Sequence, residues 1–234
     1  MSYSFQSRVR FSELDETGRL SLHSVLNYFQ DCSTFHSLSI GQDMKSVTER
    51  NRVWVLSSWQ VVIQRYPEMG EDLVVTTWPY EFRGFLGSRN FTLETGDGER
   101  LAYANTLWSF LNLETGTPER LREIDIRGFV TEPKLEMAYA PRKIAVPGHG
   151  EEKEPILVTS EHLDTNHHVN NAQYVALAQR YLPKGFVVHE MRAEYKSQTR
   201  RKDVMIPEVT SGEKVCTVLL RKPDGQEIAC VEFR

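Results

Sequence analysis

Cysteine is scarce in this 234-residue sequence, which contains only Cys32, Cys216 and Cys230. Three cysteines cannot form a fully paired disulfide framework, and no two of them have the Cys-x-x-Cys spacing of a zinc or redox motif. This scarcity excludes the class of small secreted proteins that are held together by disulfides. We therefore expect a reducing, cytoplasmic location.

Long apolar runs and a dominant charge are absent as well. The 28 basic and 32 acidic residues give a net charge of −4, so nothing in the overall charge indicates nucleic-acid binding. No apolar stretch approaches the roughly 20 residues that span a bilayer. The polar residues 1–10 lack the apolar region of a signal peptide. We expect a globular protein of one large domain, or of two with roughly 100–120 residues each.

The sequence does contain an unusual polar run from Asp164 to Asn171. A carboxylate, an amide and an imidazole occupy alternate positions, at Asp164, Asn166 and His168. Alternate side chains of an extended loop point the same way, so the three can converge on one substrate atom. The two asparagines that end the run can cap a helix, predicted over 172–181. A helix N-terminus beside these groups suits a negatively charged intermediate.

A fainter copy of this run occurs 149 residues earlier, where Asp15 aligns with Asp164. A helix is predicted after it from apolar residues at helical spacing, with Ser21 as its cap and Gly41 beyond its end. The spaced residues are Leu22, Val25, Leu26, Phe29 and Cys32. The match, the helix and a terminal Asp-Gly hairpin agree in both halves, which favours a duplication over a chance repeat.

Strands are predicted after the helix in both halves, from runs rich in β-branched and aromatic residues. The predicted strands are 53–66, 72–80, 88–95 and 99–113, and then 187–199, 204–210, 215–221 and 228–233. The last two strands of each half flank a hairpin turn, at Asp97-Gly98 or at Asp224-Gly225. A long helix packed on an antiparallel sheet, present twice, predicts an α+β tandem (double) hotdog fold.

The boundary between the halves is predicted from proline and glycine. Residues 141–155 are rich in both and are typical of a linker, and residues 120–128 predict a short helix or turn before it. We therefore expect an N-terminal hotdog over 1–140 and a C-terminal hotdog over 156–234. The first half has Arg19 where the second has His168, so we expect the first half to be chemically inactive.

The sequence resembles the acyl-acyl carrier protein thioesterases of plants and bacteria. The stretches that carry the resemblance are Trp59–Glu71, Thr77–Tyr80 with Ser88–Phe91, and Asp164-x-Asn166-x-His168-Val169-Asn170-Asn171 followed by Tyr174. Nearly the whole chain is covered. The resemblance implies a double hotdog that hydrolyses fatty acyl thioesters on acyl carrier protein. It also implies an active site in the second hotdog and an acyl pocket mainly in the first.

The resemblance further implies which residues are catalytic. Asp164, Asn166 and His168 match the family's catalytic aspartate, asparagine and histidine. The family's further catalytic position is usually a glutamate, followed in plant members by a cysteine. Gln198 and Thr199 occupy these two positions here. This is a departure from the family pattern, because glutamine cannot act as a general base and no cysteine nucleophile is available there.

We hypothesise that water attacks the thioester directly, without a covalent intermediate. The thiol leaving group has a pKa of roughly 8.5 and departs with little help, so activating water and stabilising the oxyanion are the harder tasks. His168 would act as general base or oxyanion donor, and Asp164 would hold the loop and support the imidazole. Asn166 would orient the thioester or the water, which Gln198 would position. Backbone N–H groups near Asn170 would receive the oxyanion.

Two further sets of residues are candidates for substrate binding. Apolar residues of the first half are expected to form an acyl pocket, and a basic cluster in the second is expected to attract the acidic carrier protein. The pocket set is Leu26, Phe29, Trp54 and Trp59, and the basic set is Arg192, Lys196, Arg200, Arg201 and Lys202. Ordinary core packing and a solvated strand end are the respective alternatives.

Three other functions stay open at this point. They are an acyl-CoA thioesterase on the same fold, an enzyme that hydrates enoyl thioesters, and a non-catalytic acyl-binding protein. The last is an alternative because Gln198 and Thr199 depart from the family's catalytic pattern. We expect no cofactor and no metal, because the spacing of His162, Asp164, His167 and His168 fits no common zinc pattern. Hotdog units usually pair, so a homodimer is a further expectation. The acyl chain length is not fixed by the sequence.

Overall fold

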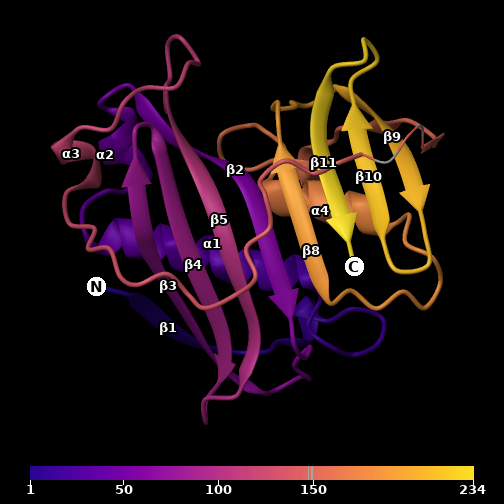
Figure 1. Cartoon of the computed structure of the whole chain (residues 1–234), viewed down its shortest axis with the longest axis horizontal. Helices are drawn as coiled ribbons and strands as arrows, with labels where there is room; N and C mark the ends of the chain where they lie inside the picture. The colour runs from indigo at the N-terminus through magenta and orange to yellow at the C-terminus, as the bar shows by residue number, and fades with distance from the viewer. Residues whose placement is uncertain (147, 149) are drawn as a thin grey trace. The chain divides into compact units, whose positions relative to one another are not determined.

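A computed structural model of the protein describes residues 1–146, 148 and 150–234. It divides the chain into two compact units, Met1–Ser57 with Val61–Tyr139, and Ser58–Gln60 with Ala140–Arg234. Each unit combines antiparallel strands with one main helix, and Figure 1 shows that helix lying across one face of the strands of its own unit.

The strands of the first unit lie in the order β1–β3–β4–β5–β2. They are β1 (Tyr3–Arg8), β2 (Arg52–Ile63, whose residues Ser58–Gln60 belong to the second unit), β3 (Asp72–Arg83), β4 (Leu86–Thr95) and β5 (Arg100–Asn112). The β1/β3, β3/β4 and β4/β5 pairs are antiparallel. The helical elements are the 3-10 turn Phe11–Glu13, α1 (Leu22–Ser39), α2 (Met44–Thr48) and α3 (Glu123–Ile126).

Helix α1 forms where the apolar spacing predicts it. The Ser21 side chain caps it by accepting a hydrogen bond from the Ser24 N–H at 3.1 Å, and Gly41 follows its end with a φ of 70°. Its buried stripe contacts β1 and β3, with Val25, Leu26 and Phe29 at most 1% exposed. Burying such side chains is worth roughly 1.5–3 kcal/mol each, which accounts for the long first helix.

The second unit repeats this plan with shorter elements. Its strands lie in the order β8–β11–β10–β9–β6, and β7 also pairs with β9. They are β6 (Glu151–Glu152), β7 (Ile156–Leu157), β8 (Glu190–Tyr195), β9 (Val204–Ser211), β10 (Cys216–Arg221) and β11 (Glu227–Phe233). After the 3-10 turn Ser160–His162, helix α4 (Asn171–Gln179) contacts β11.

The segment 141–155 is attached to the second unit and is not a free linker. Ile144 is 2% exposed and packs against Leu219 and Cys230, while Glu151–Glu152 pairs with β9 as strand β6. One buried apolar side chain and a few paired backbone groups are enough to hold the segment. The proline and glycine content of the segment favoured the prediction of a linker and gave no sign of the buried side chain or the strand pairing. Pro147, part of the predicted linker, lies outside the described residues, as does His149.

No helix among the residues that the structure describes is both long enough and apolar enough to cross a bilayer.

Candidate active site

The polar run forms a closed turn that Asp164 holds from the inside. The backbone N–H groups of Asn166 and His168 donate to Asp164 Oδ1 at 2.8 and 3.2 Å. The Asp164 N–H donates to the His168 carbonyl oxygen at 2.8 Å. His167 takes a φ of 61°, in the left-handed region. The prediction of an extended loop is therefore wrong, because the carboxylate draws the backbone into a turn.

The side chains of this loop differ in what they face. Asn166 and His167 are exposed, and His168 is partly buried. The Asp164 carboxylate binds the loop's own amides. Asp164 therefore acts first as the group that fixes the loop, and it influences the imidazole through its charge.

The N-terminus of α4 begins directly after this loop. The Asn170 side chain accepts a hydrogen bond from the Ala172 N–H at 2.8 Å, which is the predicted cap. The Asn170 N–H itself donates to the His162 carbonyl at 2.9 Å, so it is not available for an oxyanion. Among the residues that the structure describes, the Asn171 N–H has no hydrogen-bond partner. Of the backbone N–H groups near Asn170 that we expected to receive the oxyanion, this is the one that remains open to a substrate.

The His168 imidazole meets a cation. Arg200 Nε lies 3.2 Å from His168 Nε2, and the two residues also pair through their backbones. Burial and the Arg200 charge lower the pKa of His168 below its ordinary value, with a smaller contribution from His167, and Asp164 opposes the shift. His168 is therefore mostly neutral at pH 7, when its ring can accept a proton on one nitrogen or donate a hydrogen bond from the other.

The segment opposite the loop is arranged differently from the prediction. Strand β8 ends at Tyr195 and does not continue to Thr199. Thr199 is fully buried, and its hydroxyl lies 2.7 Å from that of Tyr174 on α4. A buried hydroxyl committed to packing is not placed to attack a substrate. Gln198 is exposed, where its amide can meet water.

Two tyrosines that the sequence did not mark as site residues support the loop. The Tyr174 hydroxyl oxygen accepts a hydrogen bond from the Thr199 N–H at 3.2 Å, and the Tyr195 hydroxyl donates to the Asn171 carbonyl at 2.9 Å. Burial raises the pKa of both hydroxyls, so both remain protonated. In the sequence, Tyr174 lies three residues after Asn171 and Tyr195 three residues before Gln198. This proximity could have marked both as supporting residues.

The basic cluster is smaller than predicted. Arg192 is 7% exposed and pairs with Glu232 at 3.0 Å, so its inclusion was wrong: it compensates a buried carboxylate. Lys196 pairs with Glu227, which neutralises most of its charge. Lys196, Arg200, Arg201 and Lys202 are all exposed, and the last three form the part of the cluster that this ion pair does not engage.

The residues expected to line an acyl pocket lie in two places. Leu26 and Phe29 are buried in the first unit, and the ring centroids of Phe29 and Phe91 are 5.2 Å apart. The ring centroids of Trp54 and Phe110 are 4.7 Å apart. Trp59 belongs to the second unit and not to the first. These contacts are also what ordinary core packing produces.

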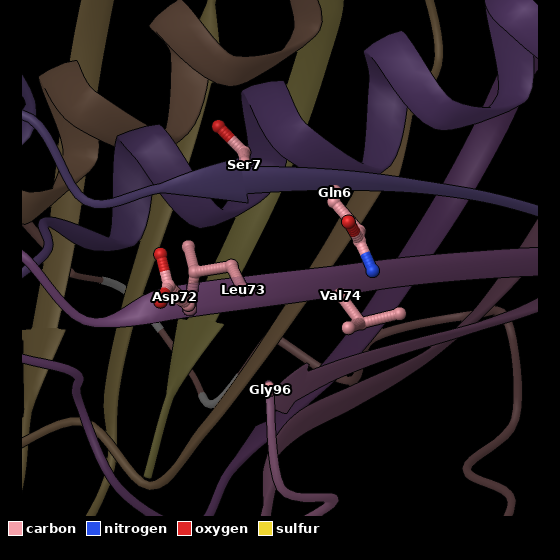
Figure 2. A pocket seen from close by; sticks show the side chains of 6 residues that line it. All are labelled: Gln6, Ser7, Asp72, Leu73, Val74 and Gly96. Carbon is pink, nitrogen blue, oxygen red and sulfur yellow. The ribbon is translucent and has the colours of Figure 1, made fainter.

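A pocket of about 290 Å³ lies elsewhere in the first unit, between β1 and β3 (Figure 2). Its lining is Gln6, Ser7, Asp72, Leu73, Val74 and Gly96. It contains none of the expected acyl-pocket residues.

Other nucleophiles and metal ligands contribute little. All three cysteines are buried and free, and burial raises the pKa of Cys32 and of Cys230 to about 12. A thiol with such a pKa is a poor nucleophile. Within the described ranges, no three His, Cys, Asp or Glu side chains gather as they would around a metal ion.

Comparisons with known proteins agree on one family. A family-wide sequence model described as the acyl-ACP thioesterase N-terminal domain matches residues 1–127. The chain is 26% identical to a chloroplastic acyl-acyl carrier protein hydrolase of Cuphea viscosissima, over 94% of this chain and 59% of that protein. It is 27% identical to a chloroplastic palmitoyl-acyl carrier protein thioesterase of Arabidopsis thaliana, over 94% of this chain and 60% of that protein. The chain thus spans about three fifths of the length of these curated relatives.

Solved structures show the same fold. An acyl-ACP thioesterase from Bacteroides thetaiotaomicron superposes with a TM-score of 0.91 and 21% identity, over 99% of this chain and 96% of that one. A 12:0-ACP thioesterase from Umbellularia californica gives a TM-score of 0.87 and 21% identity, over 100% of this chain and 96% of that one. The tandem hotdog prediction is confirmed.

Proposed function

The chain belongs to the acyl-ACP thioesterase family, and we propose that it hydrolyses fatty acyl thioesters carried on acyl carrier protein. The products are a free fatty acid and the carrier with its free thiol. The observation that carries this proposal is the closed loop Asp164–Val169 at the start of α4. It presents a neutral imidazole at His168, and the Asn171 N–H that follows has no hydrogen-bond partner among the residues that the structure describes.

The proposed reaction begins when the carbonyl is polarised. Negative charge that develops on the carbonyl oxygen is met by the Asn171 N–H and by the positive end of the α4 dipole. Asn166, exposed in the same loop, orients the thioester or the water. Asp164 keeps the loop closed by holding the Asn166 and His168 amides.

Water is the proposed nucleophile, and no acyl-enzyme forms. The buried Thr199 hydroxyl and the protonated, buried Cys230 are poor candidates for attack. Water adds to the carbonyl carbon and gives up a proton, the carbon–sulfur bond breaks, and the departing thiolate takes up that proton to become the free thiol. Gln198, exposed opposite the loop, positions the water through its amide.

The central experiment is a thiol-release assay with acyl-carrier and acyl-CoA substrates over a series of chain lengths. We expect release with the carrier substrates at higher kcat/KM. Higher kcat/KM with acyl-CoA would favour an acyl-CoA thioesterase, and acyl binding without any release would indicate a non-catalytic protein. Rapid-quench sampling supplies the mechanistic control, because an acyl group trapped on any side chain contradicts direct water attack.

Gln198 is tested in the same assay. Gln198→Ala removes one hydrogen bond to water and should lower kcat about tenfold, equivalent to about 1.4 kcal/mol. Gln198→Glu supplies a carboxylate that can accept a proton, and should retain or raise kcat. An unchanged kcat in Gln198→Ala would make this side chain an ordinary surface residue.

Carrier recognition is proposed to involve Arg201 and Lys202, which are exposed in a chain that is acidic overall. An acidic carrier is attracted by such a local basic group. Charge reversal at both positions should raise KM for acyl carrier substrates and spare a small soluble thioester. Equal effects on both substrates would remove carrier recognition from this loop.

Three further expectations accompany the proposal. The free, buried cysteines fit a reducing compartment. We propose that this compartment is the cytoplasm, and fractionation of cells measures the location.

We also propose an acyl pocket in the first unit near Leu26, Phe29 and Trp54. A larger side chain at Leu26 should shift the preferred acyl chain length, which the chain-length profile records. Assembly as a homodimer is to be tested by light scattering.

A further inference from the structure

We propose that Arg200 is a positioning residue that occupies the Nε2 lone pair of His168, so that His168 serves the reaction as an Nδ1–H donor and not as its general base. The catalytic consequence rests on the proposed thioesterase function. The assignment of the ring proton does not.

The direction of the Arg200–His168 hydrogen bond is fixed by chemistry. Guanidinium nitrogens carry only hydrogen-bond donors and stay protonated in proteins. Arg200 Nε, 3.2 Å from His168 Nε2, must therefore donate to a lone pair on that nitrogen. A neutral imidazole with a lone pair on Nε2 carries its proton on Nδ1. Among the described residues, Nδ1 has no hydrogen-bond partner, so its N–H is free for a substrate oxygen.

The backbone keeps the two side chains together. His168 and Arg200 form a β-bridge, and the Val169 N–H donates to the Thr199 carbonyl at 3.0 Å. The Arg200 N–H donates to Asp203 Oδ2 at 2.7 Å. Thr199 is itself fully buried. Arg200 is exposed, but the backbone bonds of the segment that carries it hold its side chain next to His168.

The charges around His168 agree with the donor role. Arg200 acts from the segment after β8, while Asp164 and His167 act from the loop itself. Asp203 lies beside Arg200 and is engaged with its backbone. Burial and Arg200 together lower the pKa of His168 despite Asp164, which keeps the ring neutral and makes it a weak base.

The other half of the molecule uses the same bridge with different groups. Arg19 stands in the position of His168, and it bridges Glu68 where His168 bridges Arg200. A backbone bridge at this position is therefore part of the repeated frame. In the second half it brings an arginine to an imidazole.

The ring proton is measured by long-range proton–nitrogen NMR of the full chain, selectively labelled in histidine. His168→Asn identifies the His168 signals by their disappearance. We expect protonated-type Nδ1 and lone-pair-type Nε2 shifts in the wild type. The His168 pKa should rise in Arg200→Gln and stay low in Arg200→Lys. Arg201→Gln, a matched loss of one charge at the next residue, should leave it unchanged. A proton on Nε2 in the wild type, or equal pKa values in Arg200→Gln and Arg201→Gln, overturns the proposal.

The catalytic consequence is measured separately. An asparagine amide can place an N–H close to the position of histidine Nδ1, but it cannot act as a base. His168→Asn should therefore retain at least about tenfold more kcat/KM than His168→Ala, a difference of about 1.4 kcal/mol in barrier. Equal loss in both variants contradicts the donor role. A wild type that releases no thiol from any substrate defeats the proposed function, and it leaves the NMR result standing.

Discussion

The loops Asp15–Leu20 and Asp164–Val169 share one backbone arrangement and differ in the side chains that they carry. Asp15 Oδ1 accepts from the Thr17 and Arg19 N–H groups at 2.8 and 3.4 Å, as Asp164 does from the residues two and four positions on. In each loop the aspartate N–H also donates to the carbonyl four residues later, at 2.8 Å. A side-chain cap then starts a helix in both units.

This comparison separates scaffold from chemistry. The aspartate, the turn and the cap occur in both loops, so they do not distinguish the two halves. The first loop has Arg19 where the second has His168, and an arginine cannot give or take a proton at neutral pH. The imidazole is therefore a group capable of acid–base chemistry at neutral pH that the second loop has and the first lacks.

Removal of the His168 imidazole is expected to have the largest effect. His168→Ala should lower kcat/KM for an acyl carrier substrate by about 10²–10³-fold, the usual loss when one oxyanion donor or acid–base group is removed. The matched control is Arg19→Ala, an exposed residue at the equivalent position, which should keep wild-type kcat/KM. Similar losses in the two variants would mean that both loops take part in the reaction.

A second test compares two arginine–histidine contacts. His36 on α1 is 3% exposed, and its Nδ1 lies 3.0 Å from Arg89 Nη1. Burial, with the Arg89 charge, lowers the pKa of His36 to about 4. The unfolded chain binds this proton near pH 6.5 and the folded chain only near pH 4. The associated stability is therefore fully present above pH 6.5 and is lost as the pH falls toward 4.

This loss amounts to about 3 kcal/mol of unfolding free energy. Urea denaturation between pH 7 and 4 measures it. His36→Gln cannot take up the proton and should show a shallower fall than the wild type. His168→Asn is the control, because His168 is more exposed and its contribution should be smaller. Parallel pH curves for wild type and His36→Gln would contradict the buried, neutral state of His36.

A third test asks whether the two aspartates have the same structural task. Asp164→Ala and Asp15→Ala each leave two backbone N–H groups without their acceptor, and each should lower the free energy of unfolding by about 1–2 kcal/mol. Only Asp164→Ala should also lower kcat/KM, because only that loop carries the imidazole. Chemical denaturation and the thiol-release assay measure the two effects. A stability loss confined to one variant would show that the loops are not equivalent scaffolds.

Much of the fold was predictable because short sequence patterns determine several of its elements. The apolar spacing from Leu22 to Cys32 and the two Asp-Gly turns specify a helix and two hairpins without reference to the rest of the chain. The repeat was detectable because both loops need an aspartate at the same place. Short pieces such as β6 and β7 were missed, since two-residue strands exist only through their partner β9.

The chemistry of the site was predictable as a set of residues and not as a set of contacts. The motif identified His168, but the Arg200 contact depends on a bridge between segments 32 residues apart. Similarly, the burial of Arg192 depends on Glu232 on another strand. Charge and residue type are visible in sequence, whereas the partner that cancels or redirects them is set by strand pairing.

The smallest expected effect concerns the residue before the imidazole. His167 has a φ of 61°, and Gly18 at the equivalent position has 79°. A side chain is strained in this left-handed region, and glycine is not. His167→Gly should therefore stabilise the protein by about 0.5 kcal/mol, and Gly18→His should destabilise it by about 1 kcal/mol. Urea midpoints measure both. His167 is exposed, so His167→Gly should keep its kcat/KM. A tenfold fall would place this side chain, together with His168, among the groups that meet the substrate.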